Sequence, residues 1–261
     1  MRVDLHNHTT LCNHATGSME EYIKRAIELK IDVFGFSDHA PMDFDLKYRM
    51  SIDQKEFYEN SFYYLQQKYK DEIDLKLAYE VDFMNDDKYI EDKIIDGDID
   101  YLIGSVHFIN KWGFDNPEFI GEYKNKDIDL IWEDYFDVVL QMVKSNKFDI
   151  VGHIDLLKVF KYLPKKNIKL LALDTLKEIK KSGMVLEINS SGFRKPIKEQ
   201  YPSRDILELA YELNIPITFG SDAHKVEQVG LYYDESVLLA KEIGYKECVY
   251  FTKRDKERVY F

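Results

Sequence analysis

The first residues of the chain include two histidines whose spacing suits metal binding. His6 and His8 follow Val3 and Leu5, and this alternation predicts a short strand that runs into a loop. Residues two apart on a strand point to the same side, so the two imidazoles should project together. Such a pair can hold one divalent cation, whereas a histidine that only packs in a core needs no second one beside it. Taken alone, the pair leaves a metal site and a packing role equally open.

All seven histidines share one kind of position in the sequence. Each lies at or just after the end of a predicted apolar strand, and none falls on a predicted helix. They are His6, His8, His14, His39, His107, His153 and His224. A surface or hydrogen-bonding role would suit any one of them, but it does not explain all seven. Glu80 and Asp222 stand at predicted strand ends too, which makes seven plus two, or nine, candidate ligands. One zinc ion takes three or four ligands, so the set predicts a site with two or three metal ions.

The elements that must position these side chains form a regular series. The predicted strands are a segment around Val3 and Leu5, followed by 32–37, 75–82, 101–107, 148–153, 184–189 and 215–224. The predicted helices cover 18–30, 52–70, 87–95, 129–145, 167–181 and 203–213. Short apolar strands that alternate with amphipathic helices predict an α/β fold with a parallel sheet, either a barrel or a doubly wound sheet. We favour the barrel. In both folds the functional groups collect beyond the strand C-termini, so the histidines and acids should meet on one face.

Composition narrows the class of protein. The chain has 261 residues, 45% of them hydrophobic, and no repeat or flexible linker, which predicts one domain over residues 1–261. The formal net charge of −12 argues against nucleic-acid partners and against attraction to anionic membranes. Cys12 and Cys248 provide no disulfide framework, and no apolar run reaches 18 residues. We therefore expect a cytoplasmic protein that acts on a small molecule.

The order of the candidate ligands resembles the motifs of the polymerase and histidinol phosphatase (PHP) superfamily. The matching motifs are His6-Asn7-His8, Ser37-Asp38-His39, Glu80, His107, His153 and Ser221-Asp222-Ala223-His224. This resemblance extends from residue 4 to about residue 224. The segments 104–115 and 187–196 are similar to those of the stand-alone histidinol-phosphate phosphatases of histidine biosynthesis. The superfamily fold is a distorted (β/α)7 barrel with the metal site at the strand C-terminal face, which agrees with the seven predicted units.

The resemblance also implies how the ligands are shared among the metal ions. One ion would take His6, His8, Glu80 and Asp222, a second would share Glu80 and add His107 and His153, and a third would take His14, His39 and His224. Histidine and carboxylate ligands suit zinc, iron or manganese, so the metal stays open. Cys12 matches no family ligand, and we interpret it as a small buried thiol. Ser37 and Asp38 adjoin a ligand and are expected to orient its imidazole.

The ligand set favours hydrolysis of a phosphomonoester, and the resemblance implies L-histidinol phosphate as the substrate, giving L-histidinol and phosphate. Two or three divalent cations against two carboxylates leave the site positive, so it should attract a phosphate dianion within an acidic protein. The attacking group would be a metal-bridging hydroxide whose pKa the cations lower. Arg194 is the candidate for a bidentate phosphate contact and a catalytic role. In the loop after His107, Trp112 and Phe114 are candidates for stacking on an imidazole, and Asp115 for pairing with an ammonium.

Three other functions stay open at this point. A general phosphomonoesterase would use the same site with less selectivity. A phosphodiesterase or exonuclease of the same superfamily would need a basic, aromatic groove for single strands, which the composition does not indicate. A metal-bound module without turnover would be favoured if a ligand were missing, and none of the nine is missing.

Overall fold

A parallel sheet of seven strands forms the centre of the molecule. The computed structural model describes residues 1–85 and 89–261. The strands are β1 (Val3–Asp4), β2 (Val33–His39), β3 (Asp74–Asp82), β4 (Tyr101–Ser105), β7 (Ile150–Val151), β8 (Val185–Asn189) and β9 (Ile217–Gly220), and they lie side by side in this order. Every neighbouring pair is parallel. All their C-terminal ends therefore face the same way.

The two outer strands of the sheet approach each other and nearly close a barrel. The backbone N–H of Leu5 donates to the carbonyl of Phe219 at 2.9 Å. Further along, Asp222 N donates to His6 O at 2.7 Å and His8 N donates to Ala223 O at 3.0 Å. These bonds join the segment after β1 to β9 and to the residues that follow it. The predicted barrel of parallel strands is confirmed.

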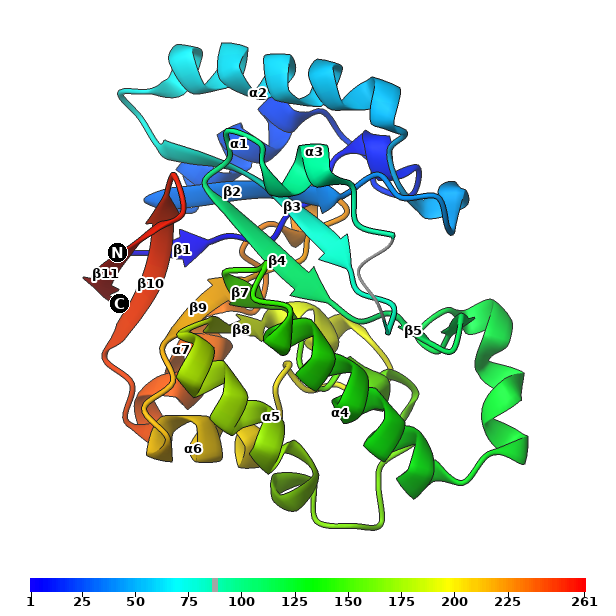
Figure 1. Ribbon diagram of the computed structural model, residues 1–261. Coiled ribbons are helices and arrows are strands. Elements are labelled where there is room, and N and C mark those ends of the chain that lie inside the picture. The colour runs from blue at the N-terminus through cyan, green and yellow to red at the C-terminus, as the bar shows by residue number, and fades with distance from the viewer. Residues whose placement is uncertain (86–88) are drawn as a thin grey trace.

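Helices surround the barrel on its outside (Figure 1). They are α1 (Met19–Glu28), α2 (Lys55–Tyr69), α3 (Asp92–Ile95), α4 (Ile128–Lys144), α5 (Ile168–Ser182), α6 (Arg204–Glu212) and α7 (Tyr233–Ile243). Helix α1 begins at a capping box, in which Ser18 and Glu21 satisfy each other's backbone N–H groups. The helix predicted over 87–95 is observed only as α3, and residues 87 and 88 lie outside the described part. Within that part, the helices are too short or too polar to cross a membrane.

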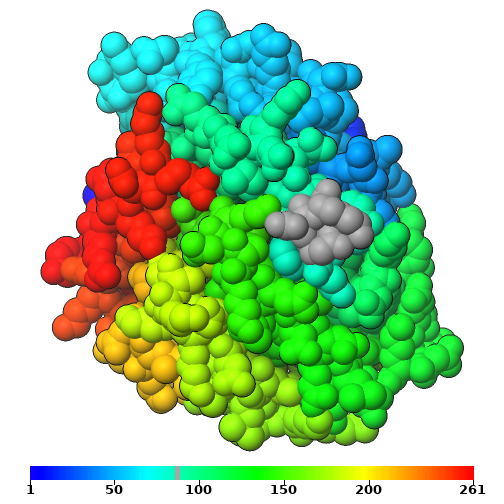
Figure 2. Space-filling model, viewed as in Figure 1, coloured from blue at the N-terminus to red at the C-terminus, as the bar shows by residue number. Residues whose placement is uncertain are grey.

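The sequence prediction stops at residue 224, and the structure adds a helix and a hairpin after it. Helix α7 is followed by β10 (Glu247–Thr252) and β11 (Asp255–Tyr260), which pair antiparallel. Phe251 of β10 is fully buried and its ring lies 5.8 Å from the ring of Tyr101 in β4. Figures 1 and 2 show this hairpin on the outside of the molecule, close to the N-terminus. It covers the barrel at the end where the strands begin.

A second, smaller hairpin follows β4 on the opposite side of the barrel. Its strands are β5 (Phe108–Ile109) and β6 (Trp112–Gly113), and a 3-10 segment (Pro117–Asn125) leads from it towards α4. This region was predicted as a long loop. The side chain of Asn116 caps the 3-10 segment by accepting from the N–H of Glu118. The segment that follows His107 is therefore ordered, and it forms one wall of the functional site described next.

Candidate metal centre

The histidine side chains meet at the C-terminal ends of the strands, as predicted. Their rings form one continuous cluster, in which every imidazole has another within about 5 Å. The centroid separations are 5.1 Å for His6–His8, 4.4 Å for His8–His39, 4.1 Å for His8–His224, 4.5 Å for His14–His224 and 4.9 Å for His107–His153. Two further contacts, His6–His153 at 5.9 Å and His39–His107 at 5.8 Å, link the two sides of the cluster.

The carboxylate of Glu80 lies in the middle of this cluster. Glu80 is on β3, and only 1% of its surface is exposed. Its Oε2 lies 3.0 Å from His39 Nδ1, 3.4 Å from His6 Nε2 and 3.7 Å from His8 Nε2, and its Oε1 lies 2.9 Å from His153 Nε2 and 3.7 Å from His107 Nε2. One carboxylate thus faces five imidazoles with its two oxygens. This is the geometry expected of a ligand shared by two cations.

The cluster contains several groups of three side chains. In each group, one possible ligand atom per residue lies within 4.8 Å of the other two. The groups are His6–His8–Asp222, Glu80–His107–His153, His8–His39–His224, Cys12–His14–His224 and His8–Cys12–Asp38. The first two correspond to the first and second ligand sets implied by the superfamily resemblance. The third implied set is divided, because His39 groups with His8 and His224, while His14 groups with Cys12 and His224. The thiol of Cys12 donates to the carbonyl of Thr9 at 3.1 Å and is fully buried.

Hydrogen bonds at Nδ1 fix the orientation of most of the rings. His6 donates to Glu187 at 2.6 Å, His14 to the carbonyl of Cys12 at 2.8 Å, His224 to the carbonyl of Asp222 at 3.1 Å, His8 to Asp38 at 3.4 Å, and His107 to Asp82. Each such bond leaves the Nε2 atom of that ring for another partner. The buried Nε2 atoms of His6 and His8 have no hydrogen bond within residues 1–85 and 89–261. Buried nitrogens aimed at carboxylates without a hydrogen bond fit a site for cations.

Burial and mutual charge set the protonation of the cluster. Burial opposes ionisation of Glu80 and Asp222, but the surrounding imidazoles, His6 foremost, hold both carboxyl pKa values well below their usual range. Burial lowers the pKa of His14 to about 4, and it lowers the pKa of His39 and His224 as well. Ionised carboxylates and neutral imidazoles are the forms that bind divalent cations.

Three other histidines respond in the opposite direction. Burial opposes their charge, but facing carboxylates raise the pKa of His6 well above its usual value, that of His8 to about 9 and that of His107 to about 10. For His6 the strongest such partner is Glu187, and for His107 it is Asp82. The facing carboxylates favour a proton on each of these imidazoles. A divalent cation bound by the rings would replace those protons and meet the same carboxylates.

A pocket of about 440 Å³ opens beside the cluster. Its lining includes His39, His107 and His153, and it extends to Arg194 and Asp115. Arg194 Nη2 donates to the carbonyls of Ser221 and Asp222 at 2.8 and 2.9 Å, which fixes the guanidinium beside a predicted ligand. Its buried Nη1 has no hydrogen-bond partner in the described part of the chain. The pocket therefore contains a guanidinium that is fixed by backbone carbonyls and whose Nη1 is available to a ligand.

The aromatic residues predicted to stack on a ligand lie elsewhere. Trp112 is only 8% exposed and Phe114 is fully buried, with Phe114 edge-on to Tyr135 at 5.3 Å. Direct stacking would require both rings to leave this packing. Phe108 and Phe119 line the pocket in their place, alongside Asp115. Sequence reasoning missed the two phenylalanines because the sequence of a loop does not indicate which of its aromatic side chains are buried in the core and which line a pocket.

The comparisons with known proteins agree with this geometry. The sequence matches the PHP domain over residues 4–191 and the PHP-associated region over residues 203–236. The first match alone spans most of the chain. The chain belongs to the PHP domain family.

Relatives within the PHP family extend over nearly the whole chain. A Deinococcus radiodurans protein named as a probable histidinol-phosphatase is 37% identical, and the alignment covers 92% of this chain and 93% of that protein. The histidinol-phosphatase of Bacillus subtilis is 28% identical over 88% of this chain and 96% of its own length. A crystal structure of histidinol phosphate phosphatase from Lactococcus lactis, in complex with zinc, L-histidinol and phosphate, covers 98% of both chains with a TM-score of 0.81. At 23% identity this last likeness confirms the PHP fold.

The sequence analysis assigned no role to three buried charges around the PHP cluster. Glu187 contacts His6, Asp82 contacts His107, and Arg49 in turn contacts Asp82. Two of them leave a trace in the sequence. Glu187 is a lone charge inside an apolar strand, and Asp82 follows Glu80 at the two-residue spacing that places both on one face. Arg49 lies in the irregular segment between β2 and α2, where no periodicity marks it.

Proposed function

We propose that this PHP-family chain is a metal-dependent phosphomonoesterase that hydrolyses L-histidinol phosphate to L-histidinol and phosphate, a step of histidine biosynthesis. The observation that carries the proposal is the juxtaposition of the histidine and carboxylate cluster with a pocket containing a fixed guanidinium. The cluster provides ligands for cations, and the pocket provides a phosphate contact and a carboxylate, Asp115. The 37% identical relative from Deinococcus radiodurans supports the choice of substrate.

For the cofactor we propose two or three divalent ions, with zinc, iron and manganese all compatible with the donor set. The residues that would hold them are His6, His8, His14, His39, Glu80, His107, His153, Asp222 and His224. The buried nitrogens of His6 and His8 that lack hydrogen bonds support this set. When bound, such cations supply Lewis-acid charge and lower the pKa of water to near neutrality.

The chain's own residues would bind and orient the substrate. Arg194 would direct its available Nη1 at a phosphate oxygen and stabilise the charge that develops as the ester bond breaks. Asp115, which also lines the pocket, would pair with the substrate ammonium. Phe108 and Phe119 line the pocket and would offer apolar surface for the imidazole ring.

We also propose that residues 1–261 act as one domain in a reducing, cytoplasmic compartment. The seven strands share one sheet, and the C-terminal hairpin packs its buried Phe251 against it. Cys12 and Cys248 are both free and buried, which suits a compartment without disulfide formation. A small phosphorylated substrate is the proposed partner, in line with the net charge of −12.

The test compares kcat/KM for L-histidinol phosphate, p-nitrophenyl phosphate, glycerol phosphate and bis-p-nitrophenyl phosphate with the same metal loading. We expect histidinol phosphate to be preferred by more than about tenfold, which corresponds to about 1.4 kcal/mol of discrimination. A smaller preference would reduce the assignment to a general phosphomonoesterase. Preference for the diester would support a phosphodiesterase instead.

A further inference from the structure

Arg49 is a buried cation in the wall of the pocket, and in the described part of the chain its hydrogen bonds and ion pairs go to residues around the metal cluster. It is 3% exposed, and it follows a 3-10 turn (Leu46–Tyr48) in the segment between β2 and α2. A guanidinium is seldom buried unless each of its donors has a partner. Three of its partners, Asp82, Ala40 and Asn13, lie beside candidate ligands, so the burial of Arg49 serves this part of the molecule.

The strongest contact joins Arg49 to Asp82. Arg49 Nη2 lies 2.8 Å from Asp82 Oδ2, and both side chains are 2% exposed. The other oxygen of Asp82 accepts the Nδ1–H of His107. Arg49 therefore holds one side of a carboxylate whose other side fixes a ring of the Glu80–His107–His153 triad. The pKa of Asp82 lies below its usual range because the charges of His107 and Arg49 outweigh the effect of burial.

Two further bonds connect Arg49 with neighbouring ligand segments. Arg49 Nη1 donates to the carbonyl of Ala40, the residue after His39, at 3.3 Å. The carbonyl of Arg49 accepts from the side-chain amide of Asn13, the residue before His14, at 3.0 Å. A third bond, from Nε to the carbonyl of Asp45 at 3.1 Å, fixes a pocket-lining turn. With Asp82 on the strand of Glu80 counted, Arg49 thus connects three segments that each carry a predicted ligand.

We propose that Arg49 is a positioning residue that holds His107, through Asp82, in the orientation needed to bind metal. The inference rests on the proposed metal centre. A carboxylate that receives an imidazole N–H is free to rotate unless its second oxygen is held, and here the buried guanidinium holds it. Without Arg49, Asp82 would lose its only described cationic side-chain partner apart from the histidines of the cluster.

The same chain offers a second, more exposed arginine–aspartate pair for comparison. Arg254 Nε lies 2.5 Å from Asp149 Oδ2, and Arg254 Nη2 donates to the carbonyl of Lys147 at 2.9 Å. This pair stands beside the C-terminal hairpin, at the end of the barrel where the strands begin. Loss of Arg254 should destabilise the fold and leave the metal centre unaffected.

The experiment measures zinc release from the full-length, zinc-loaded protein into a coloured chelator, with no substrate present. Arg49→Met should release the ion held at His107 about 10- to 100-fold faster than the unaltered chain, because loss of a residue that orients a ligand weakens metal binding by such factors. Arg254→Met should release zinc at the unaltered rate, even though its melting temperature falls. Release from Arg49→Met at the unaltered rate would overturn the proposal.

A second variant covers the case in which Arg49→Met does not fold. Asp82→Asn keeps the shape of the side chain and removes the charge between Arg49 and His107, so it should also speed zinc release about tenfold or more. Unaltered release from Asp82→Asn would overturn the connection through Asp82. Failure of the unaltered chain to retain zinc would contradict the proposed metal centre itself, and the role of Arg49 with it. If the unaltered chain retains zinc and the variants release it faster as expected, but the unaltered chain hydrolyses histidinol phosphate poorly, only the proposed substrate would be contradicted.

Discussion

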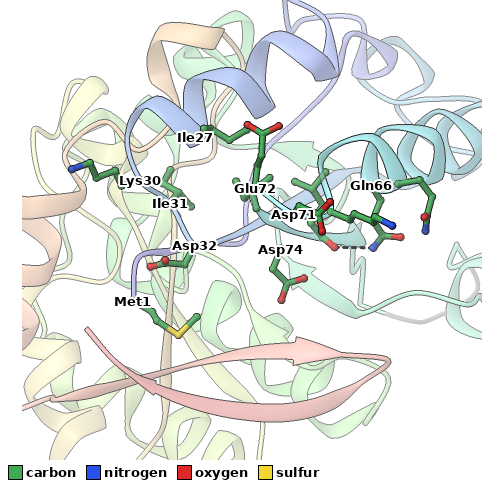
Figure 3. A pocket seen from close by; sticks show the side chains of 13 residues that line it. Met1, Ile27, Lys30, Ile31, Asp32, Gln66, Asp71, Glu72 and Asp74 are labelled. Atoms are coloured by element: carbon green, nitrogen blue, oxygen red, sulfur yellow. Dashed lines mark hydrogen bonds between the residues drawn. The ribbon is translucent and has the colours of Figure 1, made fainter.

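The two ends of the barrel both carry acidic side chains, but only one of them is built to hold cations. At the end where the strands begin, Asp32, Asp71, Glu72 and Asp74 surround an open cleft of about 720 Å³ close to Met1 (Figure 3). All four acids are exposed to water. At the opposite end, Glu80 is 1% exposed and faces five imidazoles. The number of carboxylates does not distinguish the two ends.

The difference lies in burial, ligand type and orientation. The described lining of the open cleft contains lysines and glutamines as well as acids, and it contains no histidine. In the metal cluster, each ring held at Nδ1 has a fixed direction before any cation arrives. Fixed, buried ligands lose little freedom on binding, and water screens them less than it screens exposed carboxylates. The comparison indicates that a carboxylate or imidazole becomes a metal ligand when neighbouring residues bury and orient it. Single substitutions at both ends of the barrel test this conclusion.

The largest difference between the two ends should appear when one carboxylate is neutralised at each. Glu80→Gln should lower kcat/KM for the proposed substrate by roughly 10³-fold, since loss of metal removes several kcal/mol of transition-state stabilisation. It should also remove more zinc than alteration of His14 or His224, because Glu80 is the proposed shared ligand. Elemental analysis and steady-state kinetics measure both effects. Asp74→Asn is the matched control, and equal losses in the two variants would contradict the distinction.

The next largest effect concerns the phosphate contact. Arg194→Ala should lower kcat/KM by roughly 10²-fold, as expected for lost charge-assisted hydrogen bonds worth about 2–4 kcal/mol. Metal content should stay unchanged, which elemental analysis checks, because Arg194 contacts the carbonyl of Asp222 and not its carboxylate. Lys195→Ala, at the neighbouring position in the pocket lining, is the control. Unchanged kinetics for Arg194→Ala would assign the guanidinium to backbone support alone.

The same comparison shows which features of the molecule a sequence reveals. The predicted strands and their terminal histidines agree with the structure because each is a local signal, a short apolar run that ends in a polar side chain. The contacts of Glu187 with His6 and of Arg49 with Asp82 were not predicted, because they join residues 181 and 33 positions apart. Only the folded chain brings such pairs together.

The C-terminal hairpin was missed for a different reason. Its turn places Lys253 at φ 50° and Arg254 at φ 71°, a conformation that glycine or asparagine usually signals. The turn contains neither glycine nor asparagine, so the sequence does not indicate it. Backbone bonds from Lys253 and Arg254 to Asp100 hold the turn against the start of β4. Tertiary contacts therefore compensate for unfavourable local preference at this end of the barrel.

Metal removal should loosen one end of the barrel more than the other. A bound ion at about 100 times its dissociation constant stabilises a fold by about 2.7 kcal/mol, so chelation should lower the melting temperature by about 5–10 °C for each ion lost. Amide hydrogen exchange should accelerate in the segments 9–16 and 221–228 and stay unchanged in β10 and β11. Uniform acceleration would mean that the cluster stabilises the whole barrel and not its own end.

The smallest effect is expected from the open cleft. Asp71→Asn combined with Glu72→Gln should change kcat/KM by less than about twofold and the free energy of unfolding by less than about 0.5 kcal/mol, because exposed side chains away from a site contribute little. Figure 3 shows both carboxylates among the side chains that line the cleft. Zinc content, kinetics and urea unfolding of the double variant are compared with those of Glu80→Gln. Loss of zinc or of activity in the double variant would show that exposed acids at the strand N-termini also determine function, and the contrast between the two ends would no longer hold.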